Sequence, residues 1–321
     1  MSGQKIYFHD LHPASVDVFE DVVEGLQQSP RKISPKYFYD EQGSKLFDRI
    51  TKTKEYYPTR TETALLQKYK TEIVQSLGQS CMLIEPGGGS CTKVRILLDE
   101  LQPDIFIVLD ISKEHLLESA KQLCEEIPWL EIHAVCADFT HELKLPENLP
   151  DLNKVVFFPG SSIGNFTPVE AVQCLSGIKD LLGSEGKLLI GVDLKKNKNI
   201  LEHAYNDADG ITAQFNLNLL TRFNYELSAD FNLLAWEHVS FYNSEEGCIE
   251  MHLKSLCEQV VHIGENKFHF NENEMIHTEN SYKYTVEEFQ ALGFEAGLSP
   301  EKVWLDDDRL FSLHLFSVIN N

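Results

Sequence analysis

The sequence predicts an α/β fold in which a doubly wound, largely parallel sheet carries an inserted α+β domain. Three observations predict this fold. A glycine turn connects an apolar run to a helical pattern, strands and helices alternate after it, and the alternation stops after Asp193. A chain of 321 residues that is 42% hydrophobic is long enough for one such domain with an elaboration.

The glycine turn is the clearest local feature. Residues 87–89 are all glycine; they follow the apolar run 81–84 and precede the helical pattern of residues 93–98. A second apolar run, 105–109, ends on Asp110, which lies 23 residues after the first glycine. Glycines let a backbone approach a ligand, and an acid at this distance accepts hydrogen bonds from ribose hydroxyls. The turn therefore predicts a nucleoside cofactor.

The residues around the turn favour S-adenosylmethionine over NAD as that cofactor. Three positions after the last glycine stands Thr92, where a dinucleotide turn has its third glycine. Glu85, just before the turn, is unfavourable beside a pyrophosphate but compatible with the cationic methionyl end of S-adenosylmethionine. From the turn alone, a plain connection between strand and helix stays open.

The elements that follow place further polar residues at the ends of strands. Asp138 and Phe139 come just after one expected strand, and the small-residue loop 159–165 comes after the next. Ligands of open α/β sheets bind at the carboxyl ends of the strands, so both segments are candidates for ligand contact. In this part of the chain we expect strands at 105–109, 130–136, 154–158 and 187–192, and helices at 113–123 and 168–182.

The segment after Asp193 has a different pattern and indicates an insertion. Its expected helices are 199–208 and 212–226, followed by alternating runs at 231–242, 248–256 and 260–270. The first pattern resumes with a helix at 286–292 and strands at 302–305 and 310–318, an antiparallel edge. We therefore predict a cofactor-binding domain at 61–195 and 286–321, and a substrate-binding domain at 1–60 and 196–285.

Composition excludes several classes of function. A net charge of −22 argues against a nucleic-acid substrate and favours a small neutral or cationic one. The seven cysteines form no C-x-x-C pair and no metal-ligand spacing, so we expect buried thiols in a reducing compartment. The N-terminus lacks the apolar core of a signal peptide, and no stretch is long and apolar enough for a membrane span. We expect a cytoplasmic monomer without metal, membrane or nucleic-acid partners.

Further segments stand out at 36–47, 55–62, 160–168, 204–216, 226–231 and 278–283. Together they resemble the histidine-specific methyltransferase family, whose members make hercynine, the trimethylated histidine betaine on the way to ergothioneine. The resemblance covers nearly the whole chain. It implies a Rossmann-like S-adenosylmethionine-dependent methyltransferase core with an inserted α+β substrate-binding domain, and trimethylation of the α-amine of L-histidine.

The resemblance also implies roles for individual residues. Glu279 and Ser281 fall on the imidazole contacts, Met251 on a residue lining the side-chain pocket, and Tyr39 on a tyrosine close to the reacting amine. The family's contacts to the carboxylate and amine of the amino acid fall on Tyr56, Asn165 and Tyr205. Its S-adenosylmethionine contacts fall on Gly87, Lys93, Asp110, Asp138 and Phe139. This sequence departs from the family pattern at Pro86, with the unbroken glycine run after it, and at Asn280, where an apolar residue also fits.

The chemistry of methyl transfer fits these residue types. The reaction is an in-line displacement that requires a neutral amine held against the methyl carbon, and no metal or covalent nucleophile. We expect Tyr39 to position the amine, since a tyrosine hydroxyl with a pKa near 10 is a weak base. Aromatic faces, with Tyr39, Tyr56 and Phe215 as candidates, suit the growing ammonium. On an extended segment, Glu279 and Ser281 point to one face and can pair with both imidazole nitrogens.

Three alternatives remain open on the sequence. The first is the same N-methylation on another amino acid or small aromatic amine. The second is an NAD-dependent oxidoreductase, and the third is a cofactor-binding protein without turnover. We interpret His203 and His277 as structural or surface groups, and we expect Arg60 and Glu62 to fix the segment over the cofactor cleft rather than to contact substrate.

Overall fold

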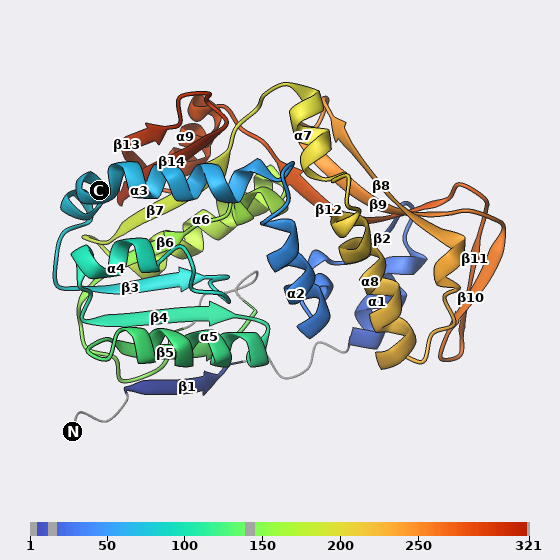
Figure 1. The fold of residues 1–321 in the computed structure, drawn as a ribbon, viewed down its shortest axis with the longest axis horizontal. Coiled ribbons are helices and arrows are strands. Elements are labelled where there is room, and N and C mark those ends of the chain that lie inside the picture. Colours follow the sequence, from blue (N-terminus) through green and yellow to red (C-terminus); the bar gives the residue numbers. More distant parts are fainter. Residues whose placement is uncertain (1–4, 12–17, 139–144, 320–321) are drawn as a thin grey trace. The chain divides into compact units, whose positions relative to one another are not determined.

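The computed structural model describes residues 5–11, 18–138 and 145–319. Its contacts divide the chain into two compact units. Unit 1 comprises Met1–Pro13, Pro58–Lys195 and Lys283–Asn321, and unit 2 comprises Ala14–Tyr57 and Lys196–Tyr282. Each unit is therefore built from segments that are distant in sequence (Figure 1).

Unit 1 is organised around a sheet in which eight strands of the described chain follow the order β1-β5-β4-β3-β6-β7-β14-β13 (Figure 1). The pairs from β1 to β7 are parallel, and β14 and β13 complete the sheet in antiparallel pairing. The strands are β1 Ile6–Asp10, β3 Cys81–Pro86, β4 Ile105–Asp110, β5 Glu131–Cys136, β6 Asn153–Phe158, β7 Lys187–Asp193, β13 Leu298–Leu305 and β14 Phe311–Val318.

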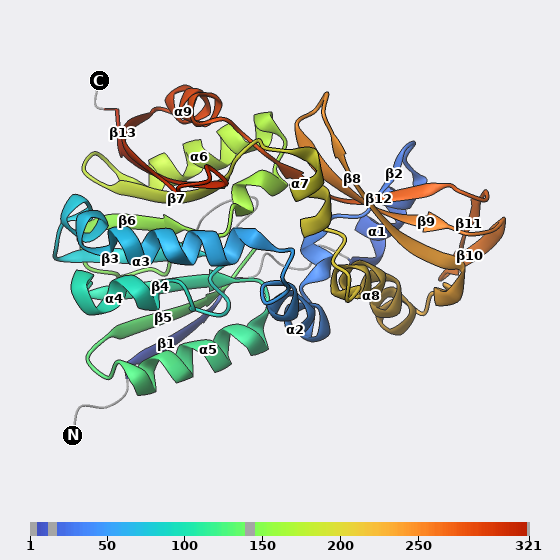
Figure 2. The ribbon, with the colours of Figure 1, turned by 45° about the horizontal axis from the view of Figure 1, so that its top comes forward.

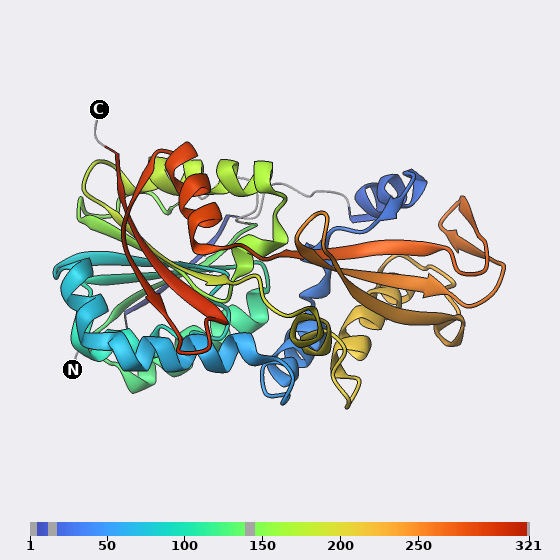
Figure 3. The same cartoon turned by 90° about the horizontal axis from the view of Figure 1, so that it is seen from above.

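Helices cover both faces of this sheet, as Figures 2 and 3 show. The helices are α3 Tyr57–Leu77, α4 Arg95–Leu101, α5 Lys113–Glu126, α6 Pro168–Leu182 and α9 Val286–Glu295. Apolar side chains of α3, α4 and α5 form one buried cluster with the strands, while α6 and α9 pack against each other on the opposite face. All six residues of β3 are buried, as expected for a central strand covered on both sides.

The predicted core elements are confirmed, and their ends follow local signals. The helix expected at 168–182 is α6; Thr167 accepts from the backbone of Glu170, and Glu170 accepts in return, which fixes its start. The strands expected at 105–109, 130–136, 154–158 and 187–192 correspond to β4, β5, β6 and β7.

Strand β1 lies in a different unit from the one that the sequence indicated. Residues 1–60 were assigned to the substrate-binding domain, yet β1 pairs in parallel with β5, where Ile6 lies opposite Ile132. The partner strand is more than a hundred residues away in the chain, so no local pattern reveals the pairing.

Unit 2 has an α+β arrangement, as predicted. Its four-stranded sheet has the order β2-β12-β9-β8, and a separate two-stranded ribbon pairs β10 with β11 (Figure 1). Helix α8 packs against β8 and β9 (Figure 2). The strands are β2 Arg31–Lys32, β8 Trp236–Asn243, β9 Cys248–Ser255, β10 Gln259–Ile263, β11 Asn266–Phe270 and β12 Met275–Tyr282. The helices are α1 Val18–Gln27, α2 Glu41–Ile50, α7 Lys198–Ala204 and α8 Ile211–Glu226, with short 3-10 helices at Pro35–Phe38 and Leu233–Ala235.

Two expectations for this part of the chain were wrong in detail. The run 260–270 is a hairpin rather than one segment, because Gly264 adopts a φ of 56° and turns the chain between β10 and β11. The seven cysteines are all free, as expected, but Cys257 is exposed because it lies in the short connection after β9. Across the three described stretches, no helix has the length and apolarity of a membrane-spanning segment.

Candidate cofactor and substrate sites

The glycine turn connects β3 to α4 in a tight conformation that depends on its glycines. Gly87 has a φ of 67°, and its N–H donates to the carbonyl of Leu109 at 2.8 Å. A Cβ on Gly88 would lie 2.6 Å from the Glu85 carboxyl carbon, and one on Gly89 would lie 2.7 Å from Asp110 Oδ2. Larger residues would therefore displace both acids, so the positions of the two carboxylates depend on glycine at these two sites.

Asp110, the last residue of β4, connects this strand to the glycine turn. Its Oδ2 accepts from the N–H of Gly89 at 3.0 Å, and its Oδ1 accepts from the N–H of Ser112 at 2.8 Å. Burial raises the pKa of this carboxyl, and the N–H groups of Ser112 and Gly89 oppose the rise. A carboxylate has about four acceptor sites, so this group retains acceptor capacity beyond its backbone contacts, which suits the predicted contact to ribose hydroxyls.

Glu85 is the most unusual acid of unit 1. It is 2% exposed, and its Oε2 has no hydrogen-bond partner among the described residues. Burial raises its pKa to about 8, and Lys93 opposes that rise. A buried acceptor without a partner beside a glycine cradle fits a ligand that brings a cation or a donor. The residues present therefore fit S-adenosylmethionine, whose methionyl end carries positive charge.

Lys93 and Glu62 form an ion pair next to this turn. Glu62 on α3 is fully buried, pairs with the Lys93 ammonium and accepts from the N–H of Gly160 at 2.9 Å. A Cβ on Gly191 would lie 2.1 Å from its Oε1. Glu62 thus links α3, the turn after β3 and the loop after β6. That Glu62 fixes the segment over the cofactor cleft stays a prediction, and Lys93 is held by a protein partner.

The remaining predicted residues of unit 1 lie at the carboxyl ends of neighbouring strands. Asp138 follows β5 and is 9% exposed, and the backbone N–H of Ala137 beside it donates to the carbonyl of Asp110 at 3.1 Å. Asn165 ends a 3-10 helix, Ser162–Asn165, after β6. The strands β5, β4, β3 and β6 are adjacent in the sheet, so these residues share its carboxyl edge with the glycine turn. Phe139, the other predicted cofactor contact, lies outside the described residues.

In unit 2 the structure brings the predicted aromatic residues into one chain of contacts. The rings of Tyr39 and Phe215 are 5.9 Å apart edge to face, and Phe47 contacts both of them. Phe47 also meets Tyr56 at 6.3 Å, and Tyr56 meets Tyr205 at 6.1 Å. Three of these five ring contacts involve Phe47, a residue to which the sequence analysis gave no role. Its place on α2 between two predicted tyrosines was the available signal.

The chain of rings ends at the predicted imidazole contacts. The hydroxyl of Tyr205 donates to Ser281 Oγ at 2.8 Å, and both side chains are buried. Glu279, 8% exposed, lies directly opposite Met251 in the pairing of β12 with β9. Because side chains alternate along a strand, Glu279 and Ser281 lie on the same side of the sheet as Met251. Six predicted substrate residues therefore belong to unit 2: Tyr39, Tyr56, Tyr205, Met251, Glu279 and Ser281.

The position of Tyr39 is set by the residue that follows it. Asp40 caps α2, accepting from the N–H of Gly43 at 2.6 Å, and also accepts from Asn218 Nδ2 of α8 at 2.9 Å. A Cβ on Gly43 would lie 1.6 Å from the carbonyl oxygen of Phe38, so this close approach requires glycine. Tyr39 is thereby held between two fixed segments.

The acidic and histidine side chains of the described residues are not grouped as metal ligands. Among the described residues, no three His, Cys, Asp or Glu side chains are grouped so that they could hold a metal ion. His203 and His277 have structural partners: His203 Nδ1 contacts the carbonyl of Asn199, and His277 Nε2 contacts Asn280 Oδ1 at 2.8 Å.

Comparison with known proteins gives a consistent result. A family model described as histidine-specific, S-adenosylmethionine-dependent methyltransferase matches residues 18–318. A histidine N-alpha-methyltransferase from Mycolicibacterium smegmatis is 40% identical over 92% of this chain and 93% of its own. The ergothioneine biosynthesis protein 1 of Neurospora crassa is 32% identical over 91% of this chain, which corresponds to 34% of its own length. A 4-dimethylallyltryptophan N-methyltransferase from Claviceps purpurea is 24% identical over 90% of this chain and 91% of its own.

The family model covers both units, and the glycine turn, its carboxylates and the paired residues of β12 all fall within the matched range. The chain belongs to the family of histidine-specific, S-adenosylmethionine-dependent methyltransferases.

Proposed function

We propose that this protein transfers methyl groups from S-adenosylmethionine to the α-amine of L-histidine until the trimethylated product, hercynine, is formed. The observation that carries the proposal is a group of buried side chains in unit 2. Glu279 and Ser281 lie on one face of β12, and Met251 of the neighbouring strand β9 lies on the same face. Tyr205 donates a hydrogen bond to Ser281. A carboxylate accepts from one imidazole N–H, and a hydroxyl serves the other nitrogen. Family membership supplies the reaction class.

The other predicted residues take roles that match their chemistry. Tyr39 positions the amine, and Tyr56, Asn165 and Tyr205 hold the carboxylate and amine of the amino acid. On the cofactor side, Gly87, Lys93, Asp110, Asp138 and Phe139 are proposed as contacts. S-adenosylmethionine supplies the methyl group as an electrophile, and the chain's own groups bind, orient and exclude water.

Repeated methylation requires a surface that tolerates a growing ammonium group. The rings of Tyr39, Phe47, Tyr56 and Phe215 form such a surface within unit 2. Each cation–π contact is worth about 0.5–2 kcal/mol, and it strengthens as the ammonium loses its hydration. This cluster supports a reaction that continues to the third methyl group.

The proposed partners are small molecules alone. The net charge of −22 disfavours nucleic acid. We also propose that the protein acts as a monomer in the cytoplasm.

Mass spectrometry tests the function directly. Purified protein is incubated with S-adenosylmethionine and a mixture of the common amino acids. The expected result is histidine carrying three added methyl groups, with every other amino acid unchanged. Product that stops at one or two methyl groups would contradict trimethylation, and an unmodified mixture would contradict the proposed activity as a whole.

A second candidate is the same N-methylation on another amino acid. The similarity to a tryptophan-derivative N-methyltransferase favours it, because a related chain acts on a different side chain according to its name. Glu279→Ala separates the two candidates. In a histidine enzyme the affinity for histidine should fall about tenfold to a hundredfold, because a hydrogen bond to a charged group contributes about 1.5–3 kcal/mol. An enzyme for tryptophan or tyrosine keeps its affinity, and Glu272→Ala, at an exposed acid of the same unit, is the matched control.

A further inference from the structure

Strand β12 contains a bulge just before the proposed imidazole contacts. His277 lies opposite His252 of β9, but the next pair is Glu279 opposite Met251, so Thr278 is an extra residue on β12. A bulge of this kind leaves one residue unpaired and changes which side chains face each side of the sheet.

The bulge decides which residues share a face with Met251. If the pairing of His277 with His252 continued without it, Thr278 would lie opposite Met251 and Glu279 opposite Glu250. Glu279 and Ser281 would then lie on the side of Glu250, and Asn280 would take the side of Met251, because side chains alternate. The bulge is therefore the feature that places the acid and the hydroxyl on the proposed substrate side.

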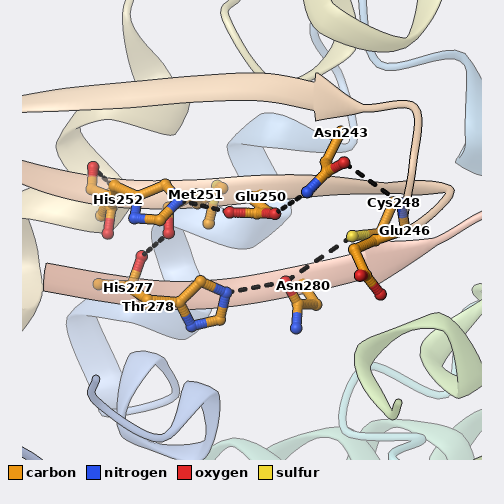
Figure 4. A network of polar contacts seen from close by, with 10 residues as sticks. Asn243, Glu246, Cys248, Glu250, Met251, His252, His277, Thr278 and Asn280 are labelled. Carbon is orange, nitrogen blue, oxygen red and sulfur yellow. Dashed lines mark hydrogen bonds and ion pairs between the residues drawn. The ribbon is translucent and has the colours of Figure 1, made fainter. Parts of the chain in front are cut away.

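A hydrogen bond spans the bulge on the other side of the sheet. His277 Nε2 and Asn280 Oδ1 are 2.8 Å apart (Figure 4). These residues are three positions apart, and in a regular strand residues at that spacing point to opposite faces. The contact is possible only because the extra residue turns both side chains to one side, so it stabilises the bulged register over the regular one.

Two neighbouring groups hold the same region. Thr278, which is fully buried, donates its hydroxyl to the carbonyl of Met251 at 3.0 Å. On β9, His252 Nε2 and Glu250 Oε2 are 2.9 Å apart, and Asn243 Nδ2 donates to Glu250 at 2.7 Å (Figure 4). Glu250 and His252, which flank Met251 on β9, thus form hydrogen bonds on the face that carries Asn280.

We propose that His277 and Asn280 are positioning residues for histidine recognition: their hydrogen bond fixes the bulge that places Glu279 and Ser281. The inference rests on the proposed function, because it takes those two residues to bind the imidazole. It gives Asn280, one of the two positions at which this sequence departs from the family pattern, a role away from the substrate. Selectivity then depends on a pair of side chains that do not touch the ligand.

Steady-state kinetics with histidine tests this role. Asn280→Leu keeps the approximate size but removes the acceptor, and Asn280→Asp keeps an acceptor oxygen. The expected result is that Asn280→Leu raises the KM for histidine about tenfold to a hundredfold, the range that misplacement of a binding group produces. The KM for S-adenosylmethionine should stay within about twofold, and Asn280→Asp should restore most of the histidine affinity. Asn266→Leu, the same exchange on β11, is the control.

The pair can also be tested from the donor side. His277→Gln retains a donor nitrogen and should resemble the wild type, whereas His277→Leu should reproduce the Asn280→Leu effect. If Asn280→Leu lowers the midpoint of unfolding, the two His277 variants provide the test instead. An unchanged histidine KM in folded Asn280→Leu and His277→Leu would overturn the inference, as would equal losses in the Leu and Asp variants of Asn280. A wild-type protein that leaves histidine unmethylated would instead overturn the proposed function.

Discussion

The hydroxyl of Tyr205 donates a hydrogen bond to Ser281 Oγ at 2.8 Å, joining the residue after α7 to strand β12. Both side chains are less than a tenth exposed, so bulk water could not readily replace this hydrogen bond if it were lost. The bond orients Ser281, whose remaining lone pair and proton are then directed away from Tyr205. A residue proposed to hold the backbone groups of the amino acid is thereby coupled to one proposed to read its side chain.

Tyr205→Phe should weaken histidine binding through this coupling. The change removes a buried hydrogen bond worth about 1 kcal/mol that orients Ser281, so we expect a histidine affinity about five to ten times weaker. Titration of the protein with histidine in the presence of S-adenosylhomocysteine measures the effect. Tyr225→Phe, at a tyrosine that is 89% exposed in the same unit, should leave the affinity unchanged. Equal affinity in both variants would show that the bond does not contribute to binding.

Glu62→Gln should destabilise unit 1 and weaken cofactor binding together. The variant can still accept from the N–H of Gly160 but leaves the Lys93 ammonium without its buried counter-charge. Breaking a buried ion pair from one side costs about 3–5 kcal/mol, and the partial exposure of Lys93 places this case at the lower end. Urea unfolding measures the stability, and titration with S-adenosylhomocysteine measures the binding. Asp307→Asn, which breaks an exposed pair with Lys68, should change neither quantity.

The affinity for S-adenosylmethionine should rise with pH through a single carboxyl. Burial raises the pKa of Glu85 to about 8 without ligand, so this group is protonated at neutral pH. A cationic ligand favours the ionised form, so binding near pH 7 should release a proton and strengthen as the pH approaches 8. Calorimetry in buffers of different ionisation enthalpy counts that proton. Glu85→Gln should lose this release while retaining any titration of the ligand itself; proton release equal to that of the wild type would contradict the assignment.

The parts of this fold that the sequence predicted are those with local signals. The capping box of Thr167 and Glu170, the glycine run and the continuous apolar strands specify their structures within a few residues each. Strand β1 could not be assigned in this way, since its place depends on pairing with a distant segment. The exposure of Cys257 likewise follows from where a strand ends, and residue type alone does not indicate it.

The candidate site also has features that local signals indicate and features that depend on long-range pairing. Residue types and the family resemblance identified Glu279 and Ser281, but they did not reveal the bulge at Thr278 on which the facing of both residues depends. A regular alternation places Glu279 and Ser281 together on one face, without saying which face. The cross-strand register is a long-range property, and so is the contact of Glu62 with Gly160, which lies 98 residues away.

Acid should destabilise this protein in part through one buried histidine. His314 on β14 is fully buried, and burial lowers its pKa to about 3 from an ordinary value of 6.5. Between those pH values the unfolded chain binds a proton that the native state does not, so the free energy of unfolding falls as the pH falls, by about 1.4 kcal/mol per unit. His314→Phe fits a site already bordered by Phe289 and Phe316 and removes this titration, although it also removes the contact with Ser312. Urea unfolding at pH 7.5, 6, 5 and 4 gives the free energy of unfolding at each pH. Its slope against pH should correspond to about one proton fewer in the variant than in the wild type. His269→Phe, at an exposed histidine of β11, serves as the control. Equal slopes for the wild type and His314→Phe would show that His314 does not titrate on unfolding.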